Sequence, residues 1–159
     1  MTCLSKIRFV HLEYCSPLLL GMGKVQANTK ICDANHDILR TLTGHGKSLS
    51  NQDLLNICKL DYSECRKKKQ SLILLFKCIR NIGPKYNRDF LRIRETSHNL
   101  RGNGVNLCVP KSNLNFMRNS FTYKCAQLWN KLLEDVKLAD DVDVFKSKLR
   151  SIQLNFYVL

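Results

Sequence analysis

Apolar residues along this chain recur mostly three or four positions apart, the spacing that places them on one face of an α-helix. Residues 24–42 show this spacing, and Gly44 and Gly46 then supply a helix stop. The longest such pattern covers residues 62–82, polar and basic in its first half and apolar in its second, before Gly83 and Pro84. The pattern therefore predicts two long helices in the first half of the chain.

Shorter helices are predicted from the residues at their beginnings. Ser50, followed three positions later by Asp53, resembles a capping pair for a helix around Leu54 and Leu55. Ser120 is placed to cap a helix whose buried stripe is Phe121, Cys125, Leu128 and Leu132. A last helix is predicted over residues 141–152, with an apolar face made of Val144, Phe145, Leu149 and Ile152. Further helical segments are predicted over residues 1–14 and 86–93.

Residues 98–110 lose the helical spacing. Gly102 and Gly104 form a Gly-x-Gly loop, and apolar and polar residues then alternate from Val105 to Val109, as in a short strand. The chain has only three prolines and seven glycines, and its 159 residues can bury a substantial core. We therefore predict a mainly α fold, a small helical bundle with a Gly-containing loop and room for one short strand or hairpin.

The cysteine pattern and the hydropathy indicate the environment of the chain. No two of the eight cysteines are closer than seven positions, so no Cys-x-x-Cys pair offers a zinc or redox site. Most lie where a helix would bury a small apolar side chain. No stretch approaches the ~20 apolar residues of a membrane span. We expect reduced thiols rather than a disulfide framework, a cytoplasmic or nuclear location, and no membrane partner.

Charge is concentrated in the middle of the chain. Residues 66–131 contain 15 Lys and Arg against only Asp89 and Glu95, and this balance of +13 equals the net charge of the whole protein. A one-sided positive field attracts polyanions such as RNA or DNA. The window therefore predicts a surface that contacts nucleic-acid backbone without sequence specificity.

Eight basic residues are the candidate phosphate contacts within this window. They are Arg66, Lys67, Lys68, Lys69, Arg88, Arg92, Arg94 and Arg101. A run such as residues 66–69 is also typical of a plain solvated helix face, and that reading stays open. Aromatic residues lie among the cations, and aromatic faces can stack bases. The Phe121 and Trp129 side chains are nevertheless expected in the core, because they lie on the apolar side of their helix.

Two motifs resemble catalytic sites but lack their context. Residues 44–48, Gly-His-Gly-Lys-Ser, end like a phosphate-binding loop, yet Thr41 stands where the first glycine belongs and a helical pattern precedes. Asp140 and Asp141 resemble a metal-binding pair, but they fit a helix start better. The four histidines share no ligand-like spacing. We therefore expect no catalytic residues, no metal, no cofactor and no enzyme activity.

Several short stretches resemble one known family. Residues 11–17, His-Leu-Glu-Tyr-Cys-Ser-Pro, are similar to the stretch just past the palm of non-LTR (LINE-type) retrotransposon reverse transcriptases, and residues 38–40, Ile-Leu-Arg, look like the helix that follows it. Residues 98–101 and 119–123 resemble the carboxy-terminal region of the same polyproteins. So does the set Ala126, Leu128, Trp129, Asn130, Phe145, Lys146 and Leu149. The resemblance spans nearly the whole chain, and its Ser-Phe-x-Tyr…Trp-Asn part is the most specific.

The departures from the family define what the resemblance implies. The endonuclease, fingers and palm are absent from the chain, and with them every catalytic carboxylate. A proline usual soon after the Trp-Asn pair is replaced by Leu132 and Leu133. The resemblance implies a non-catalytic, thumb-adjacent fragment that helps to hold template RNA or target DNA. Its expected parts are a thumb-like segment (1–47), a basic segment (48–97) and a carboxy-terminal region (98–159), which can also pack as one domain.

A second hypothesis uses the apolar faces instead of the charge. Residues 24–42 and 70–82 would then dock a partner, such as the palm domain of the parent reverse transcriptase, as a helical protein-interaction module.

Overall fold

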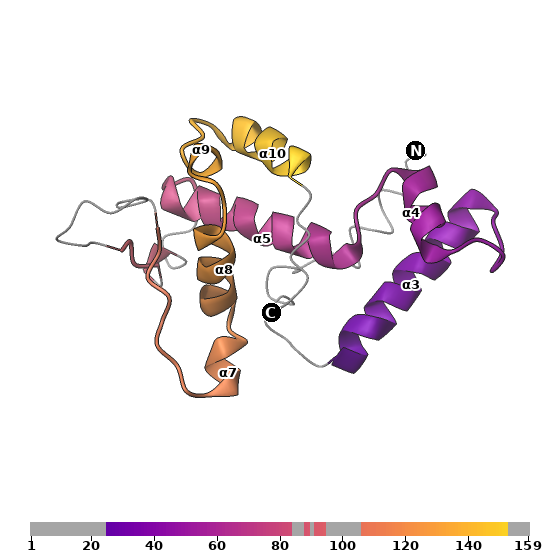
Figure 1. Cartoon of the computed structure of the whole chain (residues 1–159), viewed down its shortest axis with the longest axis horizontal. Coiled ribbons are helices and arrows are strands. Elements are labelled where there is room, and N and C mark those ends of the chain that lie inside the picture. Colours follow the sequence, from indigo (N-terminus) through magenta and orange to yellow (C-terminus); the bar gives the residue numbers. More distant parts are fainter. Residues whose placement is uncertain (1–24, 84–87, 90, 95–105, 153–159) are drawn as a thin grey trace.

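The protein is mainly helical. A computed structural model describes residues 25–83, 88–89, 91–94 and 106–152, with backbone only at 25–28 (Figure 1). The helices in these ranges are α3 (Val25–Thr43), α4 (Asn51–Cys58), α5 (Ser63–Ile79), α7 (Asn115–Arg118), α8 (Phe121–Asn130), α9 (Glu134–Lys137) and α10 (Val142–Ser151). The mainly α fold class is confirmed. The helix predicted over residues 1–14 and the loop at Gly102 and Gly104 lie outside the described residues.

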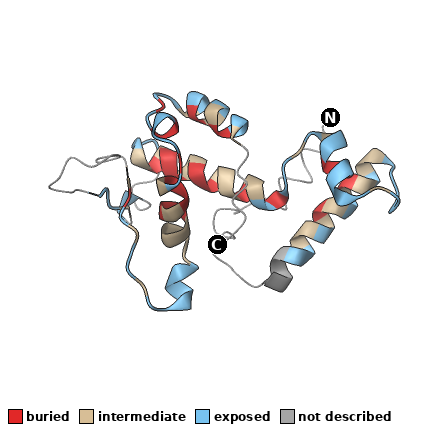
Figure 2. Cartoon of the chain, viewed as in Figure 1, coloured by how far each residue is buried: buried red, intermediate tan, exposed pale blue. Residues whose placement is uncertain are grey.

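Helix α5 runs through the middle of the molecule and connects two groups of helices. Helices α3 and α4 lie toward its beginning, whereas α8, α9 and α10 pack around its second half (Figure 1). Buried residues follow the same division, with one cluster in each group (Figure 2). The polar first half and apolar second half of the α5 sequence therefore correspond to different surroundings along one helix.

The larger core is built around three aromatic rings from three different helices. Phe76 of α5 stacks on Phe145 of α10 with ring centroids 4.3 Å apart. Trp129 of α8 lies 6.0 Å from Phe145 and 6.5 Å from Phe76. All three side chains are at most 1% exposed, and such rings contribute strongly to core stability. The expected core positions of Phe145, Leu149, Cys125 and Leu128 are confirmed, and Phe121 packs at the edge of this cluster.

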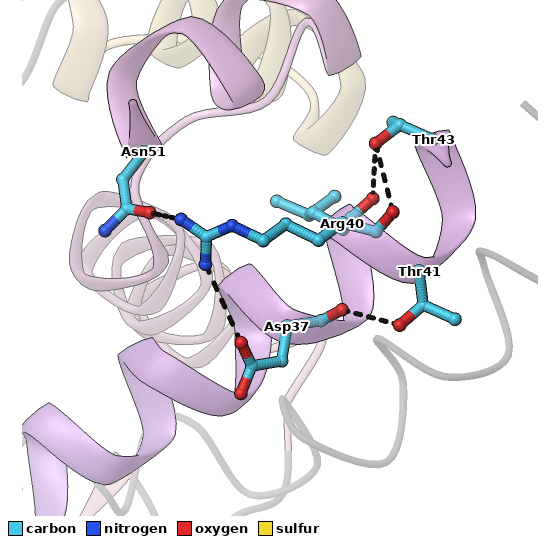
Figure 3. A network of polar contacts seen from close by, with 6 residues as sticks. Asp37, Arg40, Thr41, Thr43 and Asn51 are labelled. Carbon is cyan, nitrogen blue, oxygen red and sulfur yellow. Dashed lines mark hydrogen bonds and ion pairs between the residues drawn. The ribbon is translucent and has the colours of Figure 1, made fainter. Parts of the chain in front are cut away.

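The smaller core joins α3 to α4. Leu39 packs with Leu54 and Leu55, and all three are at most 4% exposed. Beside this cluster the Arg40 guanidinium donates to the Asn51 side chain at the beginning of α4 and lies 3.6 Å from Asp37 (Figure 3). The two helices are therefore joined by both apolar packing and a polar contact.

Local sequence chemistry sets several of the helix boundaries. The hydroxyl oxygens of Ser50 and Ser120 accept the backbone N–H groups of Asp53 and Tyr123, at 3.2 and 3.3 Å. These bonds satisfy donors that a helix beginning leaves unpaired, and both predicted caps are confirmed. Helix α10 is capped by Asp141, whose carboxylate accepts the Val142 N–H at 2.7 Å. Gly44 follows α3 with φ +71°, so the predicted glycine stop is also confirmed.

Helix α5 ends earlier than predicted. Its last residue is Ile79 rather than Ile82, because Asn81 adopts a left-handed conformation with φ +61°. The N–H groups of Asn81 and Ile82 then bond back to the carbonyls of Cys78 and Lys77, at 3.2 and 2.9 Å. This is the pattern of a Schellman motif, which asparagine tolerates better than most residues with a β-carbon. The stop therefore comes from Asn81, ahead of Gly83 and Pro84.

Two further predictions need correction. Val144 of α10 is 44% exposed and does not belong to the core face on which Phe145 and Leu149 lie. The helix predicted over residues 86–93 does not extend to its end, because Ile93 forms an isolated antiparallel bridge with Leu107. The alternation of apolar and polar residues around Leu107 predicted a short strand or hairpin. Among the described residues, this pairing is limited to the single bridge between Ile93 and Leu107.

Candidate nucleic-acid interface

The basic run of residues 66–69 lies in the first half of α5 and is largely enclosed. Lys67 is only 5% exposed. Lys68 lies 3.7 Å from Glu64, and Lys69 lies 2.7 Å from Asp61, with 16% and 14% of the two lysine side chains exposed. The run is therefore not the fully solvated helix face that the sequence alone allowed.

The acidic partners of this run lie just outside the charge window. Asp61 accepts from Lys69 through its side chain and from Arg66 through its backbone carbonyl. Glu64 is one helical turn before Lys68, a spacing at which opposite charges attract. A charge count that begins at residue 66 omits both acids. The count therefore overstated the positive charge at this end of α5.

The three candidate arginines that follow α5 are solvent-exposed. Arg88, Arg92 and Arg94 are all exposed, and Arg92 and Arg94 flank the bridge residue Ile93. The Arg92 carbonyl accepts from Cys108 N–H at 2.7 Å, and the Arg94 N–H donates to the Asn106 carbonyl at 2.8 Å. These bonds fix the backbone on either side of Ile93, so the two guanidinium groups extend from an ordered segment. The eighth candidate, Arg101, lies outside the described residues.

This segment is fixed to the helical core through Leu107. The Asn130 side chain at the end of α8 accepts from the Leu107 N–H and donates to its carbonyl, both at 2.9 Å. The Lys137 ammonium of α9 donates to the Asn106 side chain at 2.8 Å and to the Asn130 carbonyl at 3.3 Å. Lys137 is 7% exposed, and desolvation lowers its pKa from 10.5, against a smaller opposing effect of Glu134. Two side chains thus attach the arginine-bearing segment to α8 and α9.

A pocket of about 230 Å³ lies beside this attachment. Its wall is apolar apart from Arg80 and Lys137. Arg80 donates to the Ala139 carbonyl and lies over the Phe76 ring at 5.5 Å, while Lys137 bonds to Asn106 and Asn130. Both cations therefore hold neighbouring segments together, and the pocket is smaller than most ligand sites, which start near ~300 Å³. We therefore interpret the pocket as a gap between packed elements and not as a ligand site.

The motifs that resemble catalytic sites have structural roles. Residues 44–48 follow a helix, as expected, whereas a phosphate-binding loop follows a strand. Asp141 caps α10 and Asp140 precedes it. Within the described ranges, no three His, Cys, Asp or Glu side chains group closely enough to hold a metal ion. Nor does any helix of the described residues have the length and apolar character needed to cross a bilayer.

One exposed feature is not predictable from the pattern of cations. The short helix α7 buries none of its residues, and Phe116 within it is 83% exposed. Phe116 is one of the aromatic residues interspersed with cations in the sequence, but its spacing gives no sign that the ring faces solvent. The available signal is that Leu114, Phe116 and Met117 lie in a short stretch that is otherwise polar.

Comparisons with known proteins give no functional assignment, so the function has to be inferred from the candidate interface. No family model, curated protein or solved structure matches the chain.

Proposed function

We propose that this chain is a non-catalytic part of a non-LTR retrotransposon reverse transcriptase that binds RNA or DNA through the phosphate backbone. The observation that carries the proposal is the exposure of Arg92 and Arg94 on a segment attached to the core through Leu107, together with the exposed Arg88 that precedes this segment. Arginine donates up to five hydrogen bonds in a planar arrangement suited to phosphate oxygens. Contacts of this type give affinity without reading base sequence.

The distribution of acidic residues supports the same proposal. Residues 96–133 contain no Asp or Glu, and this stretch includes the strand partner of the arginine segment and the whole of α7 and α8. Lys111, Arg118 and Lys131 of this stretch are exposed. A polyanion approaching this stretch would meet its cations with no acidic residue of the same stretch to repel it.

The family part of the proposal rests on residues that have structural roles in this chain. Ser120 caps α8, Trp129 lies in the aromatic core, and Asn130 holds the Leu107 backbone. Phe145 and Leu149 are buried in α10. A related chain that kept these residues would keep the same attachment of α8, α10 and the Leu107 segment.

Salt-dependent binding tests the proposal directly. Affinities for labelled single-stranded and duplex oligonucleotides would be measured by fluorescence anisotropy across a salt series. The test variant carries Arg88→Gln, Arg92→Gln and Arg94→Gln together. The matched control carries Lys30→Gln, Lys47→Gln and Arg150→Gln, three exposed residues outside this segment, and removes the same formal charge.

The expected results follow from counterion release. Removing one arginine–phosphate interaction should reduce the salt slope by about 0.9 on duplex DNA and by about 0.7 on a single strand. The arginine variant should therefore lose most of the affinity, and its salt slope should fall by up to three times that amount, while the control stays close to wild type. Equal losses in the two variants would show that only net charge matters and would contradict an interface at these arginines.

A second candidate function is a helical module that docks a protein partner. Its specific support is an exposed apolar rim around the pocket, where Ile93 is 51% exposed and Leu138 is 56% exposed. The apolar half of α5 is less available, since Leu72, Leu75 and Phe76 are at most 1% exposed within the chain's own core. Light scattering after size exclusion separates the two functions. Salt-resistant oligomers that dissociate in a Leu138→Asp variant, without affinity for oligonucleotides, would favour docking.

A further inference from the structure

We propose that the α7 turn is a stacking site for an unpaired base of single-stranded RNA or DNA, with Phe116 as the stacking residue. This inference rests on the proposed nucleic-acid binding and adds to it the kind of strand and the contact. It concerns Leu114, Phe116 and Met117, which we call the α7 apolar tip. They are respectively 68%, 83% and 43% exposed.

The α7 apolar tip is held on the outside of the protein. Helix α7 has no buried residue and lies beyond the beginning of α8, away from the aromatic core (Figures 1 and 2). An exposed phenylalanine loses the favourable burial that it would have in a core, roughly 1.5–3 kcal/mol. The tip therefore presents apolar surface that does not contribute to the packing of the described residues.

The turn that carries the tip is locally ordered. The Ser112 hydroxyl accepts from Leu114 N–H at 3.2 Å, and the Arg118 side-chain Nε donates to the Ser112 carbonyl at 3.2 Å. Backbone bonds from Arg118 to Leu114 and from Ser120 to Met117, at 3.1 and 3.0 Å, close the turn and lead into the Ser120 cap of α8. An ordered turn positions the Phe116 ring before binding, which reduces the entropy lost on association.

The charge around the tip identifies the class of partner. Lys111 and Arg118 are exposed on either side of Phe116, and the nearest acidic residues in sequence are Glu95 and Glu134. A partner must therefore combine negative charge with flat apolar faces, and a single-stranded nucleic acid offers both in every nucleotide. An apolar protein surface would complement the ring but not the cations.

The same geometry favours a single strand over a duplex. Bases in a duplex have their faces covered by neighbouring bases, so an aromatic ring can stack on them only after they are unstacked. An unpaired strand already exposes these faces. Phosphate contacts, by contrast, are available in both forms. Phe116 should therefore raise affinity for single strands selectively, whereas Arg88, Arg92 and Arg94 should act on both.

The test compares three substitutions in the full chain. Phe116→Ala removes the ring, Phe116→Tyr retains an aromatic face, and Leu133→Ala is a control that truncates another apolar side chain with 68% exposure. Affinities would be measured for a mixed-sequence single strand and for a hairpin duplex. A strand containing 2-aminopurine reports stacking directly, because its fluorescence is quenched when the base stacks. Thermal unfolding of each variant would verify that the fold is retained.

Phe116→Ala is expected to weaken single-strand binding about tenfold or more, in line with the effect of removing a stacking aromatic, and to leave duplex binding within about twofold. It should also abolish the 2-aminopurine quench, while Phe116→Tyr and Leu133→Ala keep it. Normal single-strand affinity in Phe116→Ala, with the arginine variant defective, would overturn the stacking site and leave the proposed function standing. A wild-type chain that binds no oligonucleotide would overturn both. A smaller oligomeric mass in Phe116→Ala with unchanged nucleic-acid affinity would assign the tip to protein contact and overturn the inference.

Discussion

Asn130 holds both backbone polar groups of Leu107, accepting its N–H and donating to its carbonyl at 2.9 Å each. The two residues are 23 positions apart, and Leu107 is 2% exposed. A buried backbone needs partners for both groups, and a side-chain amide is able to supply a donor and an acceptor together. Asn130 thereby substitutes for a neighbouring strand and fixes the segment that pairs with Arg92 and Arg94.

Asn130→Asp should destabilise the protein by about 1–3 kcal/mol, because a carboxylate cannot donate to the Leu107 carbonyl and leaves it unpaired. Urea unfolding can be followed by the emission of Trp129, the single tryptophan, which is 1% exposed. Asn119→Asp, at an exposed position, serves as the control and should change stability by less than about 0.5 kcal/mol. Equal stability of Asn130→Asp and wild type would show that the amide pair is dispensable.

Phe145→Ala should cost about 3–5 kcal/mol, since it removes a fully buried ring that stacks on Phe76 and leaves a cavity. The neighbouring Val144→Ala, at a side chain 44% exposed, should change stability by less than about 1 kcal/mol. The same unfolding assay compares them. Similar losses at both positions would contradict the orientation of α10 described above.

The parts of the fold that were predictable are those that neighbouring residues determine. Ser50 and Ser120 cap the helices that follow within three positions, and the helical spacing identified Phe145 and Leu149 as buried. Val144 was assigned to the wrong side because adjacent apolar residues do not share a helix face, and only packing shows which one is buried.

The features that were not predictable depend on contacts distant in sequence or on single backbone angles. Asn130 gives no sequence sign that it bonds to Leu107, 23 residues away. The left-handed angle at Asn81 ended α5 before the glycine that the sequence favoured. In the candidate interface, charge counting found the exposed Arg92 and Arg94, but it could not show that Lys67 is buried or that Phe116 is exposed.

Lys59→Gly should stabilise the protein by about 1 kcal/mol. Lys59 follows α4 with φ +51°, a left-handed conformation in which a β-carbon is unfavourable and glycine is not. Lys59→Ala keeps the β-carbon and controls for loss of the lysine side chain, so it should bring no comparable gain. Chemical denaturation of both variants provides the measurement. A gain of equal size with alanine would attribute the effect to charge instead of backbone conformation.

Stability should depend on the protonation of Lys137. Desolvation lowers its folded-state pKa below 10.5, so between the two values the unfolded chain binds more protons, and the cost of burying the cation disappears as pH rises. Wild type should therefore gain stability relative to Lys137→Met as pH approaches 10.5. If the free energy of unfolding changed with pH in the same way for wild type and Lys137→Met, burial of the Lys137 cation would carry no such energetic cost.

The cysteines should differ sharply in their reaction with N-ethylmaleimide. Cys108 is exposed, whereas Cys125 is fully buried, and burial raises the pKa of its thiol from 9.0 to about 12 despite a hydrogen bond with Ser71. Because the thiolate is the reactive form, that change alone reduces the reactive fraction roughly a thousandfold at neutral pH.

Peptide mapping after brief alkylation of the folded chain should therefore find Cys108 modified and Cys125 protected, together with the buried Cys78. In urea all three should react at similar rates, because unfolding exposes each thiol to solvent. Cys108→Ser supplies the control, since it removes the early modification without exposing the other two. Rapid modification of Cys125 in the folded protein would mean that the interface between α5 and α8 opens readily, contrary to the packing of Cys125 against the second half of α5.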